Sequence, residues 1–343
     1  MDLWQYLSVT PKPIFLYGTG NGADKILNEL YRRGIPVKGV FASDGFVRNR
    51  TFRGFKVCSF REVKDTYGDI IVLVCFGTQL PDVMENIKKI ALACETYAPD
   101  VPVADEASVF DSEYAQLNRE KIEKAYSLLE DEFSKKVFEN TVMYKLTGKL
   151  NYLFDIETEK TETYKLLDIG ASEIYLDIGA YNGDTVAEFL QYTKQYEKII
   201  AVEPDSKNFK KLQNNTRDIK NIALINAAVT DKSGKIMFAQ KGGRNSVQNA
   251  EGTQTDAVTV DDILCGQAVT FIKMDIEGLE IPAINGAVNT LKQYKPKLNI
   301  AAYHKNGDLF EIPLLLNEIN PDYKIYLRHH PYIPSWDTNF YVL

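Results

Sequence analysis

A glycine turn between two carboxylates stands in the second half of the chain. Residues 175–184 read Tyr-Leu-Asp-Ile-Gly-Ala-Tyr-Asn-Gly-Asp, so Asp177 and Asp184 bracket Gly179 and Gly183. In a βαβ unit such a turn faces the ligand, and two fixed carboxylates there would repel a pyrophosphate. They would attract a cofactor whose nearest end is cationic and carries an ammonium group. S-adenosylmethionine fits that description, so the turn predicts a methyltransferase.

A further acid follows at the distance expected for an adenosine site. Glu203 ends the next predicted strand in Ala-Val-Glu-Pro-Asp, twenty-four residues after Gly179. An acid at this place can accept hydrogen bonds from both ribose hydroxyls of an adenosine. The alternative is that Glu203 is a solvated acid in a loop and binds no ligand. The spacing from Gly179 makes this alternative the weaker one.

The third predicted strand ends in Asn226-Ala227-Ala228. The small side chains there leave room for an adenine ring, and the Asn226 amide could form hydrogen bonds with the edge of that ring. The alternative is that Asn simply ends the strand, as Asn often does. The cofactor contacts expected from the sequence are Asp177, Gly179, Ala180, Gly183, Asp184, Glu203, Pro204, Asn226 and Ala227.

The fourth predicted strand runs into Phe-Ile-Lys-Met-Asp-Ile-Glu-Gly at 271–278. Period-two alternation places Lys273, Asp275 and Glu277 on one side if the extended run persists. Ligands of open α/β sheets bind at the carboxyl ends of strands. Asp275 and Glu277 are therefore candidates for a general base, a substrate hydroxyl anchor or a divalent metal site. An ion pair with Lys273 is the alternative.

One of the three histidines, His304, directly follows the fifth predicted strand in Ala-Ala-Tyr-His-Lys. This position is on the same sheet edge as Asp275, and a pKa near neutrality makes His304 the best proton acceptor there. The base is therefore either His304 or a carboxylate. For His329 and His330, in the last predicted hairpin, a structural role is preferred.

A second glycine turn, Gly18-Thr19-Gly20-Asn21-Gly22, follows a strand near the N-terminus. It carries no acid until Asp24, so it could accommodate a phosphate. Arg48, Arg50 and Arg53 could add phosphate contacts or form a solvated loop. A lone motif of this kind does not separate a ligand-binding domain from a structural or docking one. The candidate nucleotide site comprises Gly18, Gly20, Gly22 and Asp44.

The length of 343 residues predicts two α/β domains and a connector. We expect a Rossmann-like α/β domain at 1–110, a helical connector at 111–165 that joins the domains or covers a cleft, and a second doubly wound α/β domain at 166–343. Seven strands are expected in that last domain, and the final two should form an antiparallel hairpin at the sheet edge. Their expected ranges are 174–178, 198–202, 223–226, 271–274, 298–302, 324–327 and 340–343.

Composition narrows the classes of partner. A formal net charge of -7 gives no general attraction to nucleic acid or anionic lipid. The four cysteines have no C-x-x-C spacing, which argues against a zinc site or a disulfide framework and favours a reducing cytoplasm. Neither a signal peptide nor an apolar run of membrane-spanning length is present in the sequence. We expect a cytoplasmic protein with no nucleic-acid or membrane partner.

Five motifs in order resemble the FkbM-type S-adenosylmethionine-dependent methyltransferases. They are Leu-Asp-Ile-Gly-Ala-Tyr-Asn-Gly-Asp at 176–184, Val-Glu-Pro-Asp at 202–205, Val-Thr-Val-Asp-Asp at 258–262, Ile-Lys-Met-Asp-Ile-Glu-Gly at 272–278 and Tyr-His-Lys at 303–305. The resemblance covers residues 166–343, and Met274 departs from it, where such proteins often have a smaller aliphatic residue.

The resemblance implies a class I methyltransferase fold and methyl transfer to oxygen, often to a hydroxyl of a sugar or a polyketide-type natural product. Asp177, Gly179 and Glu203 match the cofactor motifs of the family. Asp275, Glu277 and His304 match positions near its acceptor site. The implied partners are S-adenosylmethionine and a small-molecule or glycan acceptor, with a divalent metal left open.

Two other functions remain as alternatives. One is an NAD- or sugar-nucleotide-linked enzyme centred on residues 18–23, with an auxiliary C-terminal half. The other is a non-catalytic protein that keeps the cofactor fold.

Overall fold

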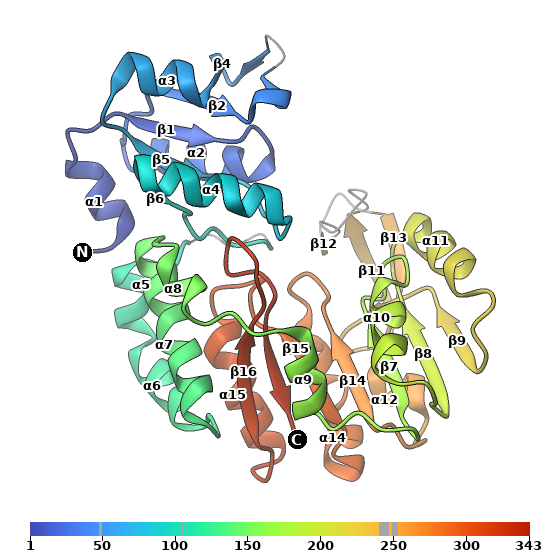
Figure 1. Ribbon diagram of the computed structural model, residues 1–343. Helices are drawn as coiled ribbons and strands as arrows, with labels where there is room; N and C mark the ends of the chain where they lie inside the picture. Colours follow the sequence, from blue (N-terminus) through green and yellow to red (C-terminus); the bar gives the residue numbers. More distant parts are fainter. Residues whose placement is uncertain (48–49, 105, 107, 240–246, 249–252) are drawn as a thin grey trace.

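The computed structural model describes residues 1–343 except 48–49, 105, 107, 240–246 and 249–252. Figure 1 shows an N-terminal sheet with its helices above a larger C-terminal sheet, and a group of helices beside the latter. Within the described residues, every helix is too short or too polar to cross a membrane.

The N-terminal sheet has the strand order β3-β4-β2-β1-β5-β6. Its helices pack on both faces: α1 and α2 share one apolar cluster with the sheet, and α3 and α4 share another. The edge strand β3 runs antiparallel to β4, so the sheet is mixed rather than parallel as expected. The elements are α1 (Leu3–Val9), β1 (Ile14–Tyr17), α2 (Asn21–Arg32), β2 (Gly39–Ala42), the 3-10 helix η1 (Asp44–Phe46), β3 (Thr51–Phe52), β4 (Phe55–Ser59), α3 (Phe60–Tyr67), β5 (Ile71–Val74), α4 (Pro81–Ala93) and β6 (Glu95–Tyr97).

Helices follow, as the helical spacing of apolar residues predicts. Asp111 accepts a hydrogen bond from the Tyr114 backbone N–H at 3.0 Å and caps the first of them, and Gly148, with φ 63°, ends the third. Val137 and Phe138 of α7 belong to the core of the C-terminal sheet, whereas Tyr144 of α7 and Leu153 of α8 pack with the N-terminal sheet. The helices are α5 (Ser112–Leu117), α6 (Arg119–Ser127), α7 (Glu132–Thr147), α8 (Asn151–Phe154) and α9 (Lys160–Leu166).

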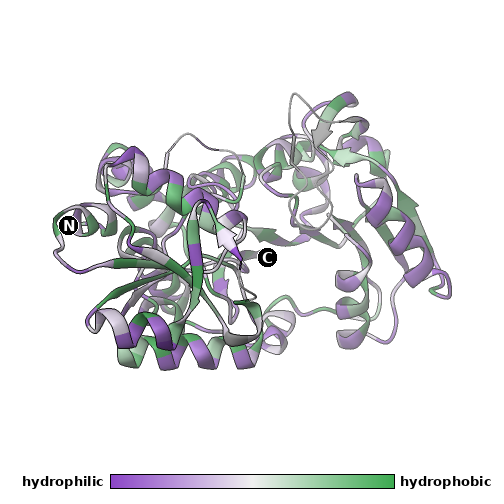
Figure 2. Ribbon diagram, turned by 90° about the horizontal axis from the view of Figure 1, so that it is seen from above, coloured by the Kyte–Doolittle hydropathy of each residue, from purple (hydrophilic) through white to green (hydrophobic). Residues whose placement is uncertain are grey.

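The C-terminal sheet has the order β16-β17-β15-β14-β7-β8-β9, with β17 antiparallel to both its neighbours. The expected seven strands and the edge hairpin are confirmed, with bounds shifted by one or two residues. Figure 2 shows mostly hydrophobic strands between helices of mixed hydropathy. The elements are β7 (Ile174–Ile178), α10 (Asp184–Tyr192), β8 (Lys198–Val202), α11 (Ser206–Thr216), β9 (Ile222–Ile225), α12 (Val260–Leu264), β14 (Phe271–Met274), α13 (Glu280–Asn285), α14 (Val288–Tyr294), β15 (Lys297–Ala301), α15 (Asp308–Ile319), β16 (Ile325–His329) and β17 (Thr338–Val342).

A small four-stranded sheet between β9 and α12 was not expected. It has the order β10-β13-β11-β12. Its strand β13 reads Thr-Gln-Thr-Asp-Ala-Val, which lacks the apolar run or regular alternation that signals a strand. The other strands are β10 (Ala228–Val229), β11 (Gly234–Ala239) and β12 (Val247–Gln248), and β13 spans Thr253–Val258.

A polar row crosses the apolar C-terminal sheet. Asp177 on β7 pairs with Lys273 on β14, which pairs with Asn299 on β15, which pairs with Tyr341 on β17. The next residues on three of these strands are apolar and fill the main core on the opposite face. Strand register therefore brings four polar side chains to one level, close to the carboxyl ends of the parallel strands.

Candidate active site

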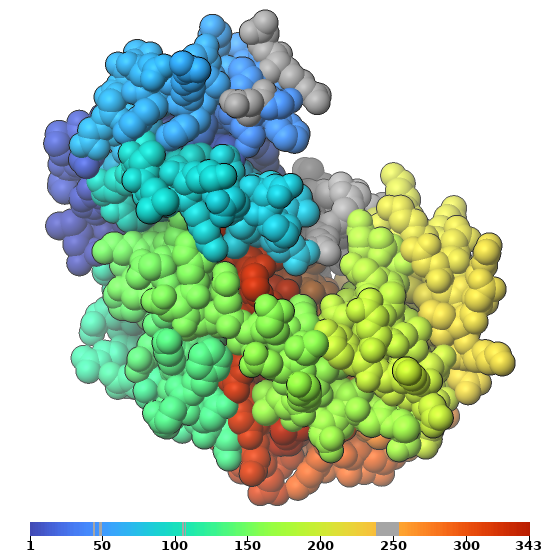
Figure 3. All heavy atoms as spheres, in the orientation of Figure 1, coloured from blue at the N-terminus to red at the C-terminus, as the bar shows by residue number. Residues whose placement is uncertain are grey.

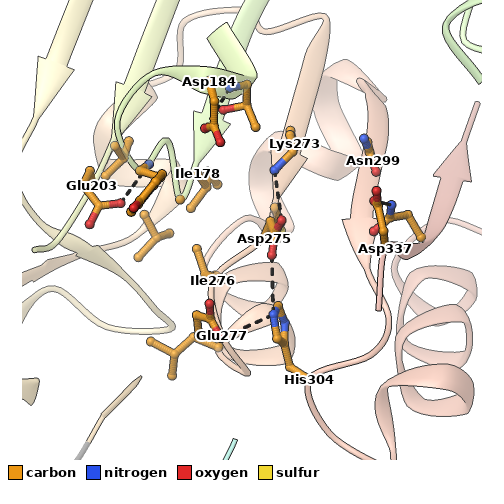
Figure 4. Close-up of a pocket in the computed structure, with 18 of the residues that line it drawn as sticks. Ile178, Asp184, Glu203, Lys273, Asp275, Ile276, Glu277, Asn299, His304 and Asp337 are labelled. Carbon is orange, nitrogen blue, oxygen red and sulfur yellow. Dashed lines mark hydrogen bonds and ion pairs between the residues drawn. The ribbon is translucent and has the colours of Figure 1, made fainter. Parts of the chain in front are cut away.

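A cavity of about 310 Å³ opens at the carboxyl ends of β7, β8, β14 and β15. Figure 4 shows Glu203 and Asp184 at one side of it, Asp275 near its middle, and Asn299 and Asp337 at the other side. Of the residues predicted to bind the cofactor, Gly179, Asp184, Glu203, Pro204 and Ala227 line it. Asp275, Glu277 and His304 line it as well.

Glu203 is held at the end of β8 by backbone donors. Its Oε2 accepts a hydrogen bond from the Tyr181 N–H at 3.0 Å, and its Oε1 accepts one from the Asp205 N–H at 2.9 Å. Burial raises the pKa of Glu203 to about 7, in opposition to these hydrogen bonds. The carboxylate is thus oriented into the cavity and titrates near neutrality.

Gly179 allows two loops to touch. Its φ is 87°, and a Cβ there would lie 2.0 Å from the Asp275 carbonyl oxygen. The glycine turn after β7 therefore packs directly on the turn after β14. Ala180 and Gly183 serve the same turn and do not line the cavity: Ala180 donates its N–H to the Val202 carbonyl at 3.0 Å, and Gly183 is the N-cap of α10.

Asp177, predicted to contact the cofactor, does not line the cavity. Asp177 is fully buried and accepts a hydrogen bond from the Thr185 hydroxyl. Strand alternation turns its side chain toward the polar row, and burial raises its pKa to about 6. Of the two acids that flank the turn, Asp184 alone lines the cavity.

Asn226 also points elsewhere. Its amide donates to the carbonyls of Glu203 at 2.8 Å and Pro204 at 3.2 Å, so it fixes the loop after β8 instead of lining the cavity. The small and apolar side chains beside it, Ala227, Ala228 and Val229, line the cavity. The expected room for a flat ring is present, but the expected amide contact is not.

His304 lies in a buried ionic cluster. Its Nδ1 is 2.8 Å from Glu280 Oε1, and its Nε2 is 3.5 Å from Asp275 Oδ1 and 3.6 Å from Glu277 Oε2. Burial by itself would lower the pKa of His304, but these three carboxylates outweigh it and raise the pKa to about 10. The imidazole therefore holds its proton at neutral pH. Of the two bases considered from the sequence, His304 or a carboxylate, these contacts favour a carboxylate, because a protonated imidazole cannot accept a proton.

Asp275 is the most accessible acid of this cluster, with 36% of its side chain exposed. Its Oδ1 accepts a hydrogen bond from the Tyr303 hydroxyl at 3.0 Å, and its Oδ2 is 3.4 Å from Lys273 Nζ. Burial would raise the pKa of Asp275, but the charges of Lys273 and His304 lower it. The ion pair considered from the sequence exists, and it leaves the carboxylate facing the cavity (Figure 4).

Alternation does not explain how Glu277 reaches His304. Strand β14 ends at Met274, and Glu277 has φ 55° in the turn that follows. A left-handed residue other than Gly or Asn is uncommon and is retained where surrounding contacts impose it. The extended run assumed from the sequence is therefore wrong after Met274.

Asp275, Glu280 and His304 offer ligand atoms within 4.8 Å of one another, which fits a divalent ion in donor number. However, Glu280 already binds His304 Nδ1, and protonated His304 and Lys273 neutralise the carboxylates that an ion would need. An ion would have to compete with two cations that already pair with these carboxylates.

Several cavity residues were missed from the sequence because no local motif marks them. Lys160 at the start of α9 lies 3.2 Å from Asp337 Oδ2 and 3.9 Å from Glu188 Oε1. Within residues 111–165, Lys160 is the single residue that lines the cavity. The other missed residues include Asn299, Tyr332 and Trp336.

The N-terminal turn lines a separate cavity of about 180 Å³, in which Gly20 and Gly22 take part and Gly18 does not. The side chain of Asp44 lies outside the described part of the structure. A Cβ on Gly22 would lie 2.4 Å from the Cys75 carbonyl oxygen, so packing on the loop after β5 already requires this glycine. Arg53 pairs with Asp24 at 2.6 Å, and Arg50 donates to the Thr19 hydroxyl at 2.7 Å. Arg48 lies outside the described residues. A nucleotide at this turn stays a prediction.

Comparisons with known proteins agree with this geometry. The family model of the methyltransferase FkbM domain matches residues 177–330. The crystal structure of methyltransferase FkbM from Methylobacillus flagellatus KT is similar over 99% of this chain and 92% of its own, with TM-score 0.75 and 23% identity. An rRNA methylase from Streptococcus thermophilus matches 53% of this chain and 92% of its own, with TM-score 0.33 and 17% identity.

Fibrillarin of Aeropyrum pernix, in complex with natively bound S-adenosyl-L-methionine, matches 53% of this chain and 73% of its own, with TM-score 0.33 and 12% identity. Among curated proteins, none matches this chain in sequence. The matched domain holds the glycine turn, Glu203 and the acidic cluster around Asp275. The family match at residues 177–330 is therefore to a methyltransferase FkbM domain, and the chain is an S-adenosylmethionine-dependent methyltransferase.

Proposed function

We propose that this protein transfers a methyl group to a hydroxyl oxygen of a sugar, glycan or related small molecule. The observation that carries the proposal is the Asp275 carboxylate, which faces the middle of the cavity and is fixed by Tyr303, Lys273 and His304. A hydroxyl needs such an acceptor because it is a poor nucleophile until its proton begins to leave.

The cavity suits the cofactor at its β8 side. Glu203 offers a carboxylate for the ribose hydroxyls, Ala227 to Val229 offer an apolar slot, and Asp184 offers a negative charge at the glycine turn. When bound, S-adenosylmethionine would supply an electrophilic methyl group, whose carbon bonds to the acceptor oxygen as its bond to sulfur breaks and the electron pair of that bond passes to the leaving thioether. Strand order then leaves the β15 and β17 side of the cavity for the acceptor.

Asp275 has two tasks in this proposal. Its carboxylate accepts the hydrogen bond of the acceptor hydroxyl and so aims the oxygen, and it takes the proton as the new carbon–oxygen bond forms. Correct orientation of the reacting atoms can lower the activation free energy by up to about 7–11 kcal/mol. Acceptance of the proton can raise the rate by about 100-fold or more. Tyr303 and Lys273 keep the carboxylate from rotating out of line.

The pKa of Glu203 predicts how cofactor affinity depends on pH. A ribose diol is bound by the ionised carboxylate, so affinity should be highest above pH 8 and fall as the pH decreases through 7. When the pH decreases from 8 to 6, we expect the Kd for S-adenosylmethionine, measured by calorimetry, to increase about tenfold. The Glu203→Gln variant should bind more weakly at pH 8 and lose this component of the pH dependence. An equal pH dependence in the two proteins would remove Glu203 from the site.

Metal removal should leave the activity unchanged. Because His304 and Lys273 already balance the carboxylates around Asp275, we expect methyl transfer to persist after dialysis against EDTA. The measurement is turnover before and after dialysis, with Mg²⁺, Mn²⁺ or Zn²⁺ added back separately. Activity that disappears on dialysis and returns with one ion would show instead that the cluster binds metal.

The function itself is tested by incubation with methyl-labelled cofactor and a fractionated cell extract, followed by chemical identification of the labelled product. A methyl ether on a sugar or related alcohol supports the proposal. Label on nitrogen or carbon contradicts it. Tight cofactor binding without any labelled product would favour the non-catalytic alternative, and a preference for NADH or a UDP-sugar would favour the N-terminal one.

A further inference from the structure

The loop between β16 and β17 is built against the N-terminal sheet. Ile333 and Thr78 exchange two backbone hydrogen bonds, of 2.7 and 3.0 Å. The Ser335 hydroxyl donates to Asp100 Oδ1 at 3.3 Å, and Asp100 forms a buried ion pair with Lys145 at 2.7 Å. Figure 3 shows atoms of this hairpin, in red, between the N-terminal half in cyan and the C-terminal half. The loop therefore has a fixed place that the N-terminal half determines.

Trp336 of this loop rests on a glycine. A Cβ on Gly77 would lie 2.3 Å from Trp336 Cζ3, so any larger residue at 77 would move the indole. The Tyr332 ring lies 5.7 Å from the Trp336 ring, at an angle of 35°. Both aromatic side chains line the cavity that holds Asp275. They give its β17 side an apolar, rigid surface of the kind on which a flat ligand face packs.

Asn299 adds a polar group to this surface. Its side chain is 8% exposed and lines the same cavity, and none of the side-chain hydrogen bonds between described residues involves its amide, which can therefore bond to a ligand or water there. A buried amide without a partner costs free energy unless a ligand or water satisfies it. An amide both donates and accepts hydrogen bonds, which matches a hydroxyl. Strand pairing places Asn299 between Lys273 and Tyr341.

Aromatic faces together with an unsatisfied amide are complementary to one class of molecule. A pyranose ring has C–H faces that pack on aromatic rings and hydroxyl edges that bond to amides and carboxylates. We propose that Trp336, positioned by Gly77, is the platform for the ring of a pyranose acceptor, and that Asn299 hydrogen-bonds one of its hydroxyls. This proposal rests on hydroxyl methylation as the function. It makes the N-terminal half a determinant of acceptor specificity.

The two tryptophans of the chain, Trp4 and Trp336, allow a direct test. Trp4 is buried in the N-terminal core, so Trp4→Phe leaves Trp336 as the sole tryptophan reporter. The probes are a panel of methyl pyranosides, with phenol as an aromatic comparison, titrated in the presence of S-adenosylhomocysteine. We expect at least one pyranoside to change the Trp336 emission saturably. In the Trp4→Phe background, Asn299→Leu should weaken that binding about tenfold.

Gly77→Ala, in the same background, should also weaken pyranoside binding, while Gly45→Ala, a position with open space around its Cβ, should not. Affinity for S-adenosylhomocysteine, measured by calorimetry, should be unchanged in all three, which separates a lost acceptor subsite from misfolding. Saturation by phenol but by no pyranoside would overturn the proposal. So would equal pyranoside binding in Asn299→Leu and its parent. If a labelled methyl ether still forms in either case, hydroxyl methylation stands and the pyranose subsite alone fails.

Discussion

Replacing Asp275 by Asn is expected to reduce kcat by at least about 100-fold and to leave the Kd for S-adenosylmethionine within about twofold. Asn has the shape of Asp but cannot accept the proton of the acceptor hydroxyl. Asp275 lies between the Glu203 side of the cavity, where the cofactor is proposed to bind, and the Asn299 side, so its loss should affect the chemical step rather than cofactor binding.

The measurement is single-turnover methyl transfer together with calorimetry of cofactor binding. Asp322→Asn is a matched control, because Asp322 is an exposed acid that also pairs with a lysine. Glu277→Gln is the informative comparison within the cluster, since Glu277 contacts the same imidazole but belongs to the turn. Wild-type turnover in Asp275→Asn, or an equal loss in Asp322→Asn, would refute the assignment of Asp275 as proton acceptor.

Replacing His304 by Ala is expected to lower the free energy of unfolding by about 3–5 kcal/mol. The side chain is 1% exposed and its charge balances Glu280, which is fully buried, as well as Asp275 and Glu277. Without the imidazolium, these carboxylates are left as buried charges with too few counterions. The loss should appear in urea unfolding as a lower midpoint with an unchanged slope.

The same cation has a pH signature. The folded pKa of His304 is about 10, against 6.5 as the ordinary value. A raised pKa of a basic group contributes stability fully below pH 6.5, and this contribution decreases as the pH rises toward 10. We expect the stability difference between the wild type and His304→Gln to shrink over that range. A difference that grows with pH, or an Ala variant as stable as the wild type, would contradict the cationic assignment.

The sequence predicted the C-terminal sheet well because its strands are buried on both faces. Continuous apolar runs such as Ile199 to Val202 mark such strands without any knowledge of their neighbours. The turn after β7 was also predictable from the sequence, because Gly179 and Gly183 both adopt positive φ, a conformation that glycine allows. The small sheet at β10 to β13 was not predicted because two of its strands are only two residues long and its pairing partners are distant in sequence.

Side-chain direction at the site could not be inferred in the same way. Asp177 and Asn226 carry the right chemistry at the right places in the chain, yet hydrogen bonds to Thr185 and to the loop after β8 turn them away from the cavity. His304 has the composition of a base, and three carboxylates that lie 24 to 29 residues earlier in the sequence convert it to a cation. Local sequence does not encode such pairings because they depend on which loops meet.

By itself, the sequence determined that the chain holds two α/β units and a methyltransferase motif set, since apolar periodicity and glycine turns act over a few residues. The tertiary structure alone decided the rest: which acid faces the cavity, what charge His304 carries, and that Trp336 and Asn299 stand beside Asp275. Those outcomes follow from the burial of charges and from contacts between distant segments, which exist only once the sheet is assembled.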